Sequence, residues 1–242
     1  NMYKLAAEET PTVMHVAARA ISTHALSIFG DHSDVMACRQ TGFAMLCSSD
    51  VQEVMDLGAV AHLSAIAGKV PVMHFFDGFR TSHEQQKISV WDYDELRSMV
   101  DWDAVKRFRE NALNPNHPHS MGSAEQPETF FQHREACNKN YDDTVEIVAK
   151  YMDMVSEKTG KTPHYKPFNY YGAEDAEEVI VAMGSVCDAI EEAIDYANAN
   201  GKKTGLVVVR LYRPFSRKYF LEALPDTVKK IAVLDRTKEP GS

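Results

Sequence analysis

Two short apolar runs separated by a polar stretch constrain the fold of this chain most strongly. The runs, residues 13–17 and 43–47, are bounded by polar or glycine residues, which is typical of strands buried in a parallel sheet. In open α/β sheets, chemistry collects just beyond the carboxyl ends of the strands. Arg19 lies two residues beyond the first run, so we expect it at such a site.

Composition argues against several classes of protein. The formal net charge of -9 is the opposite of what a general nucleic-acid surface needs. The sequence has no apolar run long enough for a transmembrane helix. Its first residues, NMYKLAAEETPTV, lack the basic and apolar regions of a signal peptide. We therefore expect a cytoplasmic protein without a nucleic-acid or membrane partner.

The sequence offers no set of residues with metal-ligand spacing. Its cysteines are widely scattered and none forms a CxxC pair, so they indicate neither a zinc site nor an iron–sulfur site. We expect Cys47 and Cys187 to be buried and reduced, since their surroundings are apolar. His117 and His119 lie in a loop rich in turn-forming residues and have no third ligand nearby. No metal site is predicted.

The apolar pattern divides the chain into two units, residues 1–163 and 164–242. In the first unit we expect strands at residues 12–18, 35–37, 43–47 and 70–76. We expect helices at 1–9 and 50–68, one or two helices at 92–111, and a helix at 127–159 that is broken near residues 138–140. Asp50 and Glu53 match a capping box at the start of the second of these helices. Residues 20–29 are either a short helix or an irregular loop. In the second unit, the order strand, helix, strand, helix, strand over residues 177–234 predicts a right-handed parallel arrangement.

Three long motifs resemble one known family. The segments HVAARAISTHALSIFGDH (15–32), RQTGFAML (39–46) and HFFDGFRTSHE (74–84) closely resemble pyruvate:ferredoxin (flavodoxin) oxidoreductase, and the resemblance extends along the whole chain. It implies an α/β fold of two parallel-sheet units. Residues 1–163 would be part of a domain like the pyrimidine-binding domain of thiamine enzymes. Residues 164–242 would be the first part of a domain like the carboxyl-terminal domain of transketolase.

The resemblance also implies a function for the complete protein. That enzyme uses thiamine diphosphate, Mg²⁺ and [4Fe-4S] clusters to decarboxylate pyruvate oxidatively, and forms acetyl-CoA from coenzyme A. Its electrons pass to ferredoxin or flavodoxin, and we expect a homodimer. The family's thiamine-activating carboxylate would lie before this segment, and its magnesium-binding and cluster-binding parts after it. We therefore expect that this chain binds none of these cofactors wholly and is inactive in isolation.

Arg19 is the leading functional candidate. A guanidinium at the end of a strand can hold a carboxylate through two parallel hydrogen bonds. The arginine of the family's HVxAR motif contacts pyruvate, and Arg19 occupies the matching position. The alternative is a structural arginine paired with Asp31 or Glu8. Two other functions stay open: a non-catalytic interaction module that keeps the fold, and a sister oxidoreductase for another 2-oxo acid.

Weaker candidates surround Arg19 in the sequence. His24 is one of them. Asp31 and His32 could form a carboxylate–imidazole pair, although the sequence favours a turn cap at Asp31 and a locally bonded histidine. Arg39 suits either a structural role or a contact with a neighbouring domain. We expect His74 to be a core histidine, the run at residues 77–84 to contact a domain or subunit, and the helix start at Ser185 to be a weak anion-binding candidate.

Overall fold

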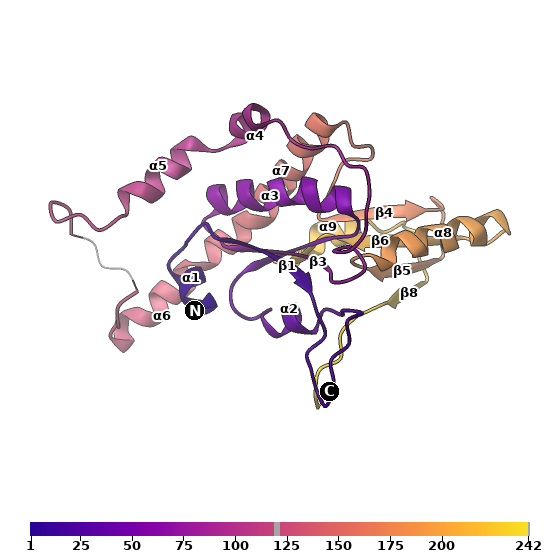
Figure 1. Ribbon diagram of the computed structural model, residues 1–242, viewed down its shortest axis with the longest axis horizontal. Coiled ribbons are helices and arrows are strands. Elements are labelled where there is room, and N and C mark those ends of the chain that lie inside the picture. The colour runs from indigo at the N-terminus through magenta and orange to yellow at the C-terminus, as the bar shows by residue number, and fades with distance from the viewer. Residues whose placement is uncertain (119–121, 242) are drawn as a thin grey trace.

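The first of two mixed sheets contains the strands that carry the motifs. The computed structural model describes residues 1–118 and 122–241 (Figure 1). Within them, one four-stranded sheet has the order β1-β3-β2-β7. Its parallel strands are β1 (Val13–Ala18), β3 (Val72–Asp77) and β2 (Ala44–Ser48), and β7 (Leu211–Arg213) pairs with β2 in the antiparallel direction. The predicted α/β class is confirmed, with an antiparallel edge strand that was not predicted.

The second sheet has the order β4-β6-β5-β8. Strands β5 (Glu178–Ala182), β6 (Thr204–Val209) and β8 (Lys230–Val233) are parallel, as the sequence predicted, whereas β4 (Phe168–Gly172) is an unpredicted antiparallel edge. Because β7 follows β6 directly yet joins the first sheet, the later part of the chain completes the earlier sheet. The boundary between residues 163 and 164 stays a prediction.

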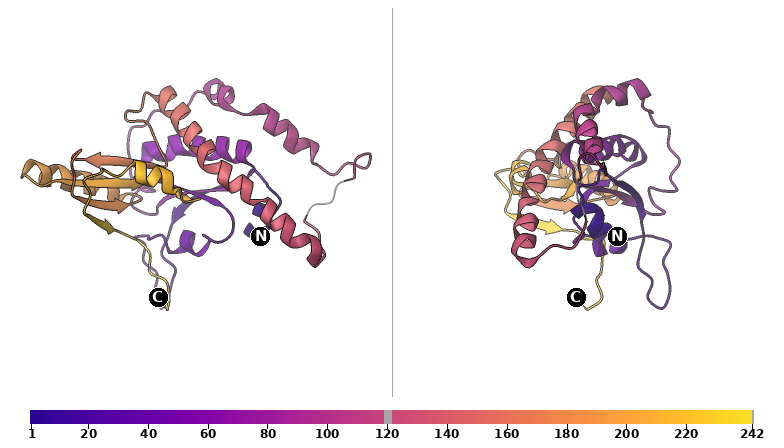
Figure 2. Two further views of the ribbon diagram at one scale, coloured as in Figure 1. Left: turned by 180° about the vertical axis from the view of Figure 1, so that it is seen from behind. Right: turned by 90° about the vertical axis from the view of Figure 1, so that its left-hand side faces the viewer.

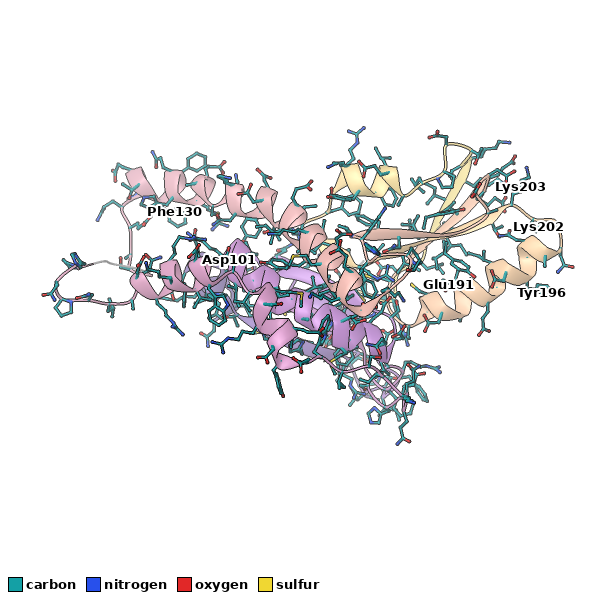
Figure 3. The ribbon with its side chains drawn as sticks, turned by 90° about the horizontal axis from the view of Figure 1, so that it is seen from above. Asp101, Phe130, Glu191, Tyr196, Lys202 and Lys203 are labelled. Carbon is teal, nitrogen blue, oxygen red and sulfur yellow. The ribbon has the colours of Figure 1, made fainter. Side chains whose placement is uncertain are left out.

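The helices pack around these sheets. Their bounds are α1 (Met2–Ala7), α2 (Ser33–Ala37), α3 (Val51–Gly68), α4 (Tyr93–Met99), α5 (Trp102–Glu110), α6 (Pro127–Ala136), α7 (Asn138–Thr159), α8 (Val186–Ala199) and α9 (Arg217–Glu222). Figure 3 shows α6, with Phe130, and the tip of the second unit, with Tyr196 and Lys202, at opposite ends of an elongated molecule. In the described part of the chain, no helix has both the length and the apolar character needed to cross a membrane. His119 lies outside the described residues.

The expected strand at residues 35–37 is wrong, because these residues belong to helix α2. The Asp31 carboxylate accepts a hydrogen bond from the Ser33 amide and starts a turn there. Val35 and Met36 then face the core from one side of a short helix. A run of three apolar residues is too short to distinguish the repeat of a helix from the alternation of a strand. Residues 20–29, for which two possibilities were open, form an irregular loop.

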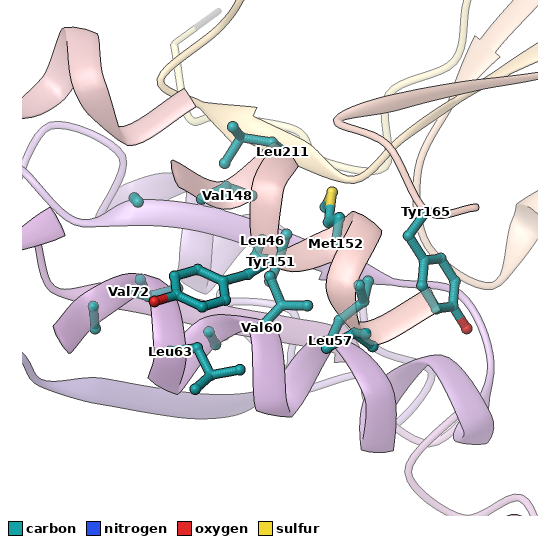
Figure 4. Close-up of a cluster of buried hydrophobic side chains, with 14 of the residues drawn as sticks. Leu46, Leu57, Val60, Leu63, Val72, Val148, Tyr151, Met152, Tyr165 and Leu211 are labelled. Atoms are coloured by element: carbon teal, nitrogen blue, oxygen red, sulfur yellow. The ribbon is translucent and has the colours of Figure 1, made fainter. Parts of the chain in front are cut away.

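Helix α3 begins where its capping residues predict. The Asp50 side chain accepts a hydrogen bond from the Glu53 amide, and the Glu53 carboxylate reaches back to the Ser49 amide. The helix lies on one face of the first sheet, and α7 packs beside it (Figures 2 and 4). Leu57, Val60 and Met152 are fully buried there, together with Leu46 from β2. This layer forms the first hydrophobic core.

A second core joins the two sheets. Met45 and Cys47 of β2 point to the face opposite Leu46, as the alternation of a strand requires. They pack with Phe75 of β3 and with Val181 and Val207 of the second sheet. The first sheet is therefore covered on both faces, and the second unit provides part of the cover.

A buried ion pair also connects the two units. The Arg210 guanidinium, between β6 and β7, contacts the Glu53 carboxylate on α3, and these side chains are only 9% and 4% exposed. Arg210 donates a further hydrogen bond of 2.7 Å to the Asn169 side chain. Burying a charge costs several kcal/mol, and here each charge offsets the cost of the other. Removing one partner would therefore leave an uncompensated buried charge and destabilise the fold.

Replacing Arg210 by methionine should lower the free energy of unfolding by about 3–5 kcal/mol, because the Glu53 carboxylate stays buried without its partner. Urea denaturation of the purified chain measures this change. Arg107→Met is the matched control, since Arg107 pairs with Asp101 at the surface, and it should cost less than about 1 kcal/mol. Equal losses for the two variants would contradict the structural role of the buried pair.

Three histidines form a hydrogen-bonded chain between α3 and the first sheet. The Nε2 atoms of His62 and His15 are 3.1 Å apart, and the Nδ1 atoms of His15 and His74 are 2.9 Å apart. The Nε2 atom of His74 lies 2.8 Å from the Ser48 hydroxyl. His74 is fully buried, and burial, followed by the neighbouring His15 and His62, lowers its pKa to about 3. The interpretation of His74 as a hydrogen-bonded core residue agrees with these contacts.

This pKa predicts a loss of stability in acid. Between about pH 6.5 and pH 3 the unfolded chain binds a proton at His74 that the folded chain excludes, so the free energy of unfolding falls as the pH falls. The slope reaches about 1.4 kcal/mol per pH unit for one such proton. His74→Gln should flatten this decline relative to His117→Gln, a loop control, in urea denaturation at several pH values. Parallel pH profiles for the two variants would refute the assignment.

Candidate functional site

Arg19 follows β1 directly and lies half-buried at the carboxyl end of the first sheet. Its amide donates a 2.9 Å hydrogen bond to the Asp34 carboxylate, and its guanidinium donates one of 3.2 Å to the Ile28 carbonyl. Within the described residues its side chain forms no ion pair. The partners expected for a structural arginine are engaged elsewhere: Glu8 pairs with Lys4, and Asp31 accepts from Ser33.

Two glycines let backbone segments approach the carboxyl end of β1 closely. The Gly78 amide donates a 3.0 Å hydrogen bond to the Ala18 carbonyl. A Cβ atom at Gly78 would lie 2.3 Å from that carbonyl oxygen and 2.7 Å from the Nε of Arg19. A Cβ atom at Gly30 would lie 2.4 Å from the same oxygen. The Arg19 side chain therefore lies against the bare backbone of Gly78.

Asp77, the residue before Gly78, carries a negative charge that several neighbouring side chains contact. Its carboxylate is fully buried and accepts from His32 Nε2 at 2.6 Å, from the Ser185 amide at 2.6 Å and from the Ser185 hydroxyl at 2.5 Å. The Arg236 guanidinium lies 3.0 Å away. Burial alone would raise the pKa of Asp77, but the hydrogen bonds from His32 and Ser185 outweigh it and hold the pKa at about 2. The carboxylate therefore stays ionised at neutral pH.

His32 pairs with Asp77 and not with the neighbouring Asp31. It is fully buried, and its Nδ1 atom has no hydrogen-bond partner among the described residues. Its ring packs edge-on against Phe75 at 5.4 Å. The structure thus brings His32 close to the Arg19 region through Asp77, whereas Asp31 caps the turn that precedes α2.

His24 and Arg39 lie apart from this centre. His24 is in the exposed loop. The Arg39 guanidinium donates to the Met36 carbonyl and pairs at 2.7 Å with Glu239, near the end of the chain. Arg39 thus contacts the second unit, one of the two roles that we considered for it.

Sequence reasoning did not identify Ser185 and Arg236 as partners of Asp77. The sequence did carry part of the information needed to find these contacts. It indicates that the run beginning at Asp77 contacts a domain or subunit, and that the helix start at Ser185 could bind an anion. The anion at that helix start is the Asp77 carboxylate itself. Gly184 permits the approach: its φ is +79°, and a Cβ there would lie 2.9 Å from the carboxylate.

The described residues do not themselves form a metal centre. Among them, no group of three or more histidine, cysteine or acidic side chains is placed to hold a metal ion. All four cysteines are free, and Cys47 and Cys187 are buried as predicted. Burial raises the pKa of the Cys187 thiol to about 12, so this thiol is protonated and unreactive. Around Arg19 and Asp77, the described side chains provide charged and hydrogen-bonding groups held in defined positions.

Known proteins with this sequence pattern are large oxidoreductases. The chain is 61% identical to pyruvate:ferredoxin oxidoreductase from Moorella thermoacetica and 58% identical to pyruvate-flavodoxin oxidoreductase from Enterobacter agglomerans. Each match covers 100% of this chain and 20% of the relative, so the chain spans about a fifth of their length. A solved structure of 2-oxoglutarate:ferredoxin oxidoreductase from Magnetococcus marinus, with 2-oxoglutarate, coenzyme A and succinyl-CoA bound, has a TM-score of 0.62 and 17% identity. It matches 96% of this chain and 43% of that chain, and supports the fold.

Two family models match different parts of the chain. Residues 176–242 match core domain II of pyruvate:ferredoxin oxidoreductase. Residues 1–153 match the thiamine diphosphate-binding domain of pyruvate flavodoxin/ferredoxin oxidoreductase. With this coverage and these identities, the chain belongs to the pyruvate:ferredoxin/flavodoxin oxidoreductase family.

Proposed function

We propose that this chain supplies the substrate-carboxylate contact of a larger enzyme that oxidatively decarboxylates pyruvate. The placement of Arg19 carries the proposal: its guanidinium lies at the carboxyl end of β1 and forms no ion pair within the described residues. The two parallel N–H donors of a guanidinium match a carboxylate. This contact would orient the 2-oxo carbonyl and position the carboxylate that leaves as carbon dioxide.

The cofactors would be held mainly by the rest of the complete protein. The described residues do not fit Mg²⁺ or a [4Fe-4S] cluster, since they contain no suitable group of ligands. The first family model is described as thiamine diphosphate-binding, which supports a position of this chain beside that cofactor. When bound, thiamine diphosphate supplies the carbon nucleophile of the decarboxylation. The contribution of this chain is to bind and orient the substrate.

The remaining partners follow from the same proposal. They are coenzyme A, ferredoxin or flavodoxin, the other domains of the enzyme and a second copy in a homodimer. The loop next to Arg19 supports cover by another part of the assembly, because Ile21, Leu26, Ile28 and Phe29 are each more than half exposed. Such a cluster of apolar side chains is typical of a contact surface.

The proposed compartment is the cytoplasm.

Replacing Arg19 by alanine in the complete oxidoreductase should lower kcat/KM for pyruvate at least about 100-fold, because two charge-assisted hydrogen bonds are lost. Arg19→Lys should fall between the alanine variant and the unmodified enzyme, since lysine keeps the charge but not the fork of donors. Steady-state kinetics measures the effect. Arg107→Ala, at a surface pair remote from the site, is the control.

The same variants separate the alternatives. A large kinetic loss with unchanged thermal unfolding supports substrate binding. A loss of thermal stability that accompanies the kinetic loss supports a structural role for Arg19. Unchanged kinetics supports a non-catalytic interaction module. A sister oxidoreductase would be recognised by a higher kcat/KM for another 2-oxo acid, such as 2-oxoglutarate, than for pyruvate.

A further inference from the structure

The buried carboxylate of Asp77 is held mainly by the second unit. Two of its partners are Ser185, at the start of α8, and Arg236, in the segment after β8. His32, its third partner, is also tied to that segment, because its amide donates a 2.9 Å hydrogen bond to the Arg236 carbonyl. The second unit therefore supplies most of the donors that hold the Asp77 side chain at the carboxyl end of β3.

A single residue, Gly78, separates Asp77 from the Arg19 side chain. Gly78 follows Asp77, and its backbone is bonded to Ala18, the residue before Arg19. The Arg19 side chain lies so close to Gly78 that a Cβ atom there would be 2.7 Å from Nε and 2.8 Å from Cδ. A displacement of the end of β3 would therefore displace the surface against which the Arg19 side chain rests.

We propose that Asp77 is a positioning residue for Arg19 and that the second unit sets the direction of the Arg19 guanidinium through it. The carboxylate receives charged and neutral donors from separate segments of the chain, so it holds the end of β3 in one place. The consequence for catalysis rests on the proposed function, whereas the positioning of Arg19 does not.

The kinetic test uses Asp77→Asn in the complete oxidoreductase. An asparagine keeps the size of the side chain, but it loses the charge and one of the two acceptor oxygens. We expect the KM for pyruvate to rise about tenfold or more, with a smaller fall in kcat, because a displaced Arg19 weakens substrate binding. Ser185→Ala, which removes one donor and keeps the carboxylate, should give a smaller change of the same kind if Asp77→Asn folds poorly.

Asp56→Asn is the matched control. Asp56 is also a buried carboxylate, only 2% exposed, and joins α3 to the later part of the chain through a 2.9 Å hydrogen bond from the Tyr165 hydroxyl. It does not contact the Arg19 region, so its loss should affect thermal unfolding and leave the KM for pyruvate unchanged. An equal rise of KM in both variants would overturn the proposal.

A double-mutant cycle separates positioning from general destabilisation. If Asp77 acts through Arg19, then Asp77→Asn should add nothing to the KM of Arg19→Ala. Independent effects that multiply would overturn the proposal. Gly78→Ala should raise KM as Asp77→Asn does, because the added methyl group would clash with both the Ala18 carbonyl and the Arg19 side chain.

A second readout does not depend on catalysis. Phenylglyoxal modifies accessible arginine side chains, and peptide mass mapping of the complete oxidoreductase gives the rate at Arg19. We expect this rate to rise several-fold in Asp77→Asn and to stay unchanged in Asp56→Asn. If Arg19→Ala leaves the kinetics unaltered, the proposed function fails, and the modification rate alone decides the positioning role. Equal rates of Arg19 modification in Asp77→Asn and in the protein without a substitution would overturn the positioning role.

Discussion

The structure depends on a buried carboxylate that no single segment of the chain satisfies. Removing the charge of Asp77 from water costs several kcal/mol, and hydrogen-bond donors must offset this cost. They come from the loop before α2, from the start of α8 and from the segment after β8. The negative charge also lies at the amino end of α8, where the helix dipole favours it. The end of the first sheet and the second unit therefore stabilise each other.

Much of the fold was predictable because its signals are local. The three parallel strands of the first sheet are apolar runs with clear ends, and Asp50 and Glu53 mark the start of α3. The strand and helix order of the second unit also followed from its pattern. Strands β4 and β7 were not predictable, because each forms by antiparallel pairing with a strand more than 30 residues away. Helix α2 was missed because its apolar segment is shorter than one turn.

The site was predictable by residue but not by pairing. Arg19 and His32 were singled out from one motif, and both lie at the carboxyl end of the sheet. The partner of His32 is 45 residues away, and it is brought close by the register in which Ala18 pairs with Asp77. Spacing along the sequence favours Asp31 as the partner, yet Asp31 bonds to the turn beside it. Contacts set by strand register are not encoded in any one motif.

The alternation of side chains along β3 explains why Asp77 couples the two units while His74 does not. His74 faces α3, where His15 and Ser48 of the same sheet satisfy its ring nitrogens. Asp77 lies an odd number of residues further on and faces the opposite side, toward α2 and the second unit. The α3 side of the strand is thus satisfied within the first unit, whereas the other side needs α8 and Arg236. Under the proposed positioning role of Asp77, the surface that supports Arg19 depends on the second unit, because Gly78 follows Asp77 directly and lies against the Arg19 side chain.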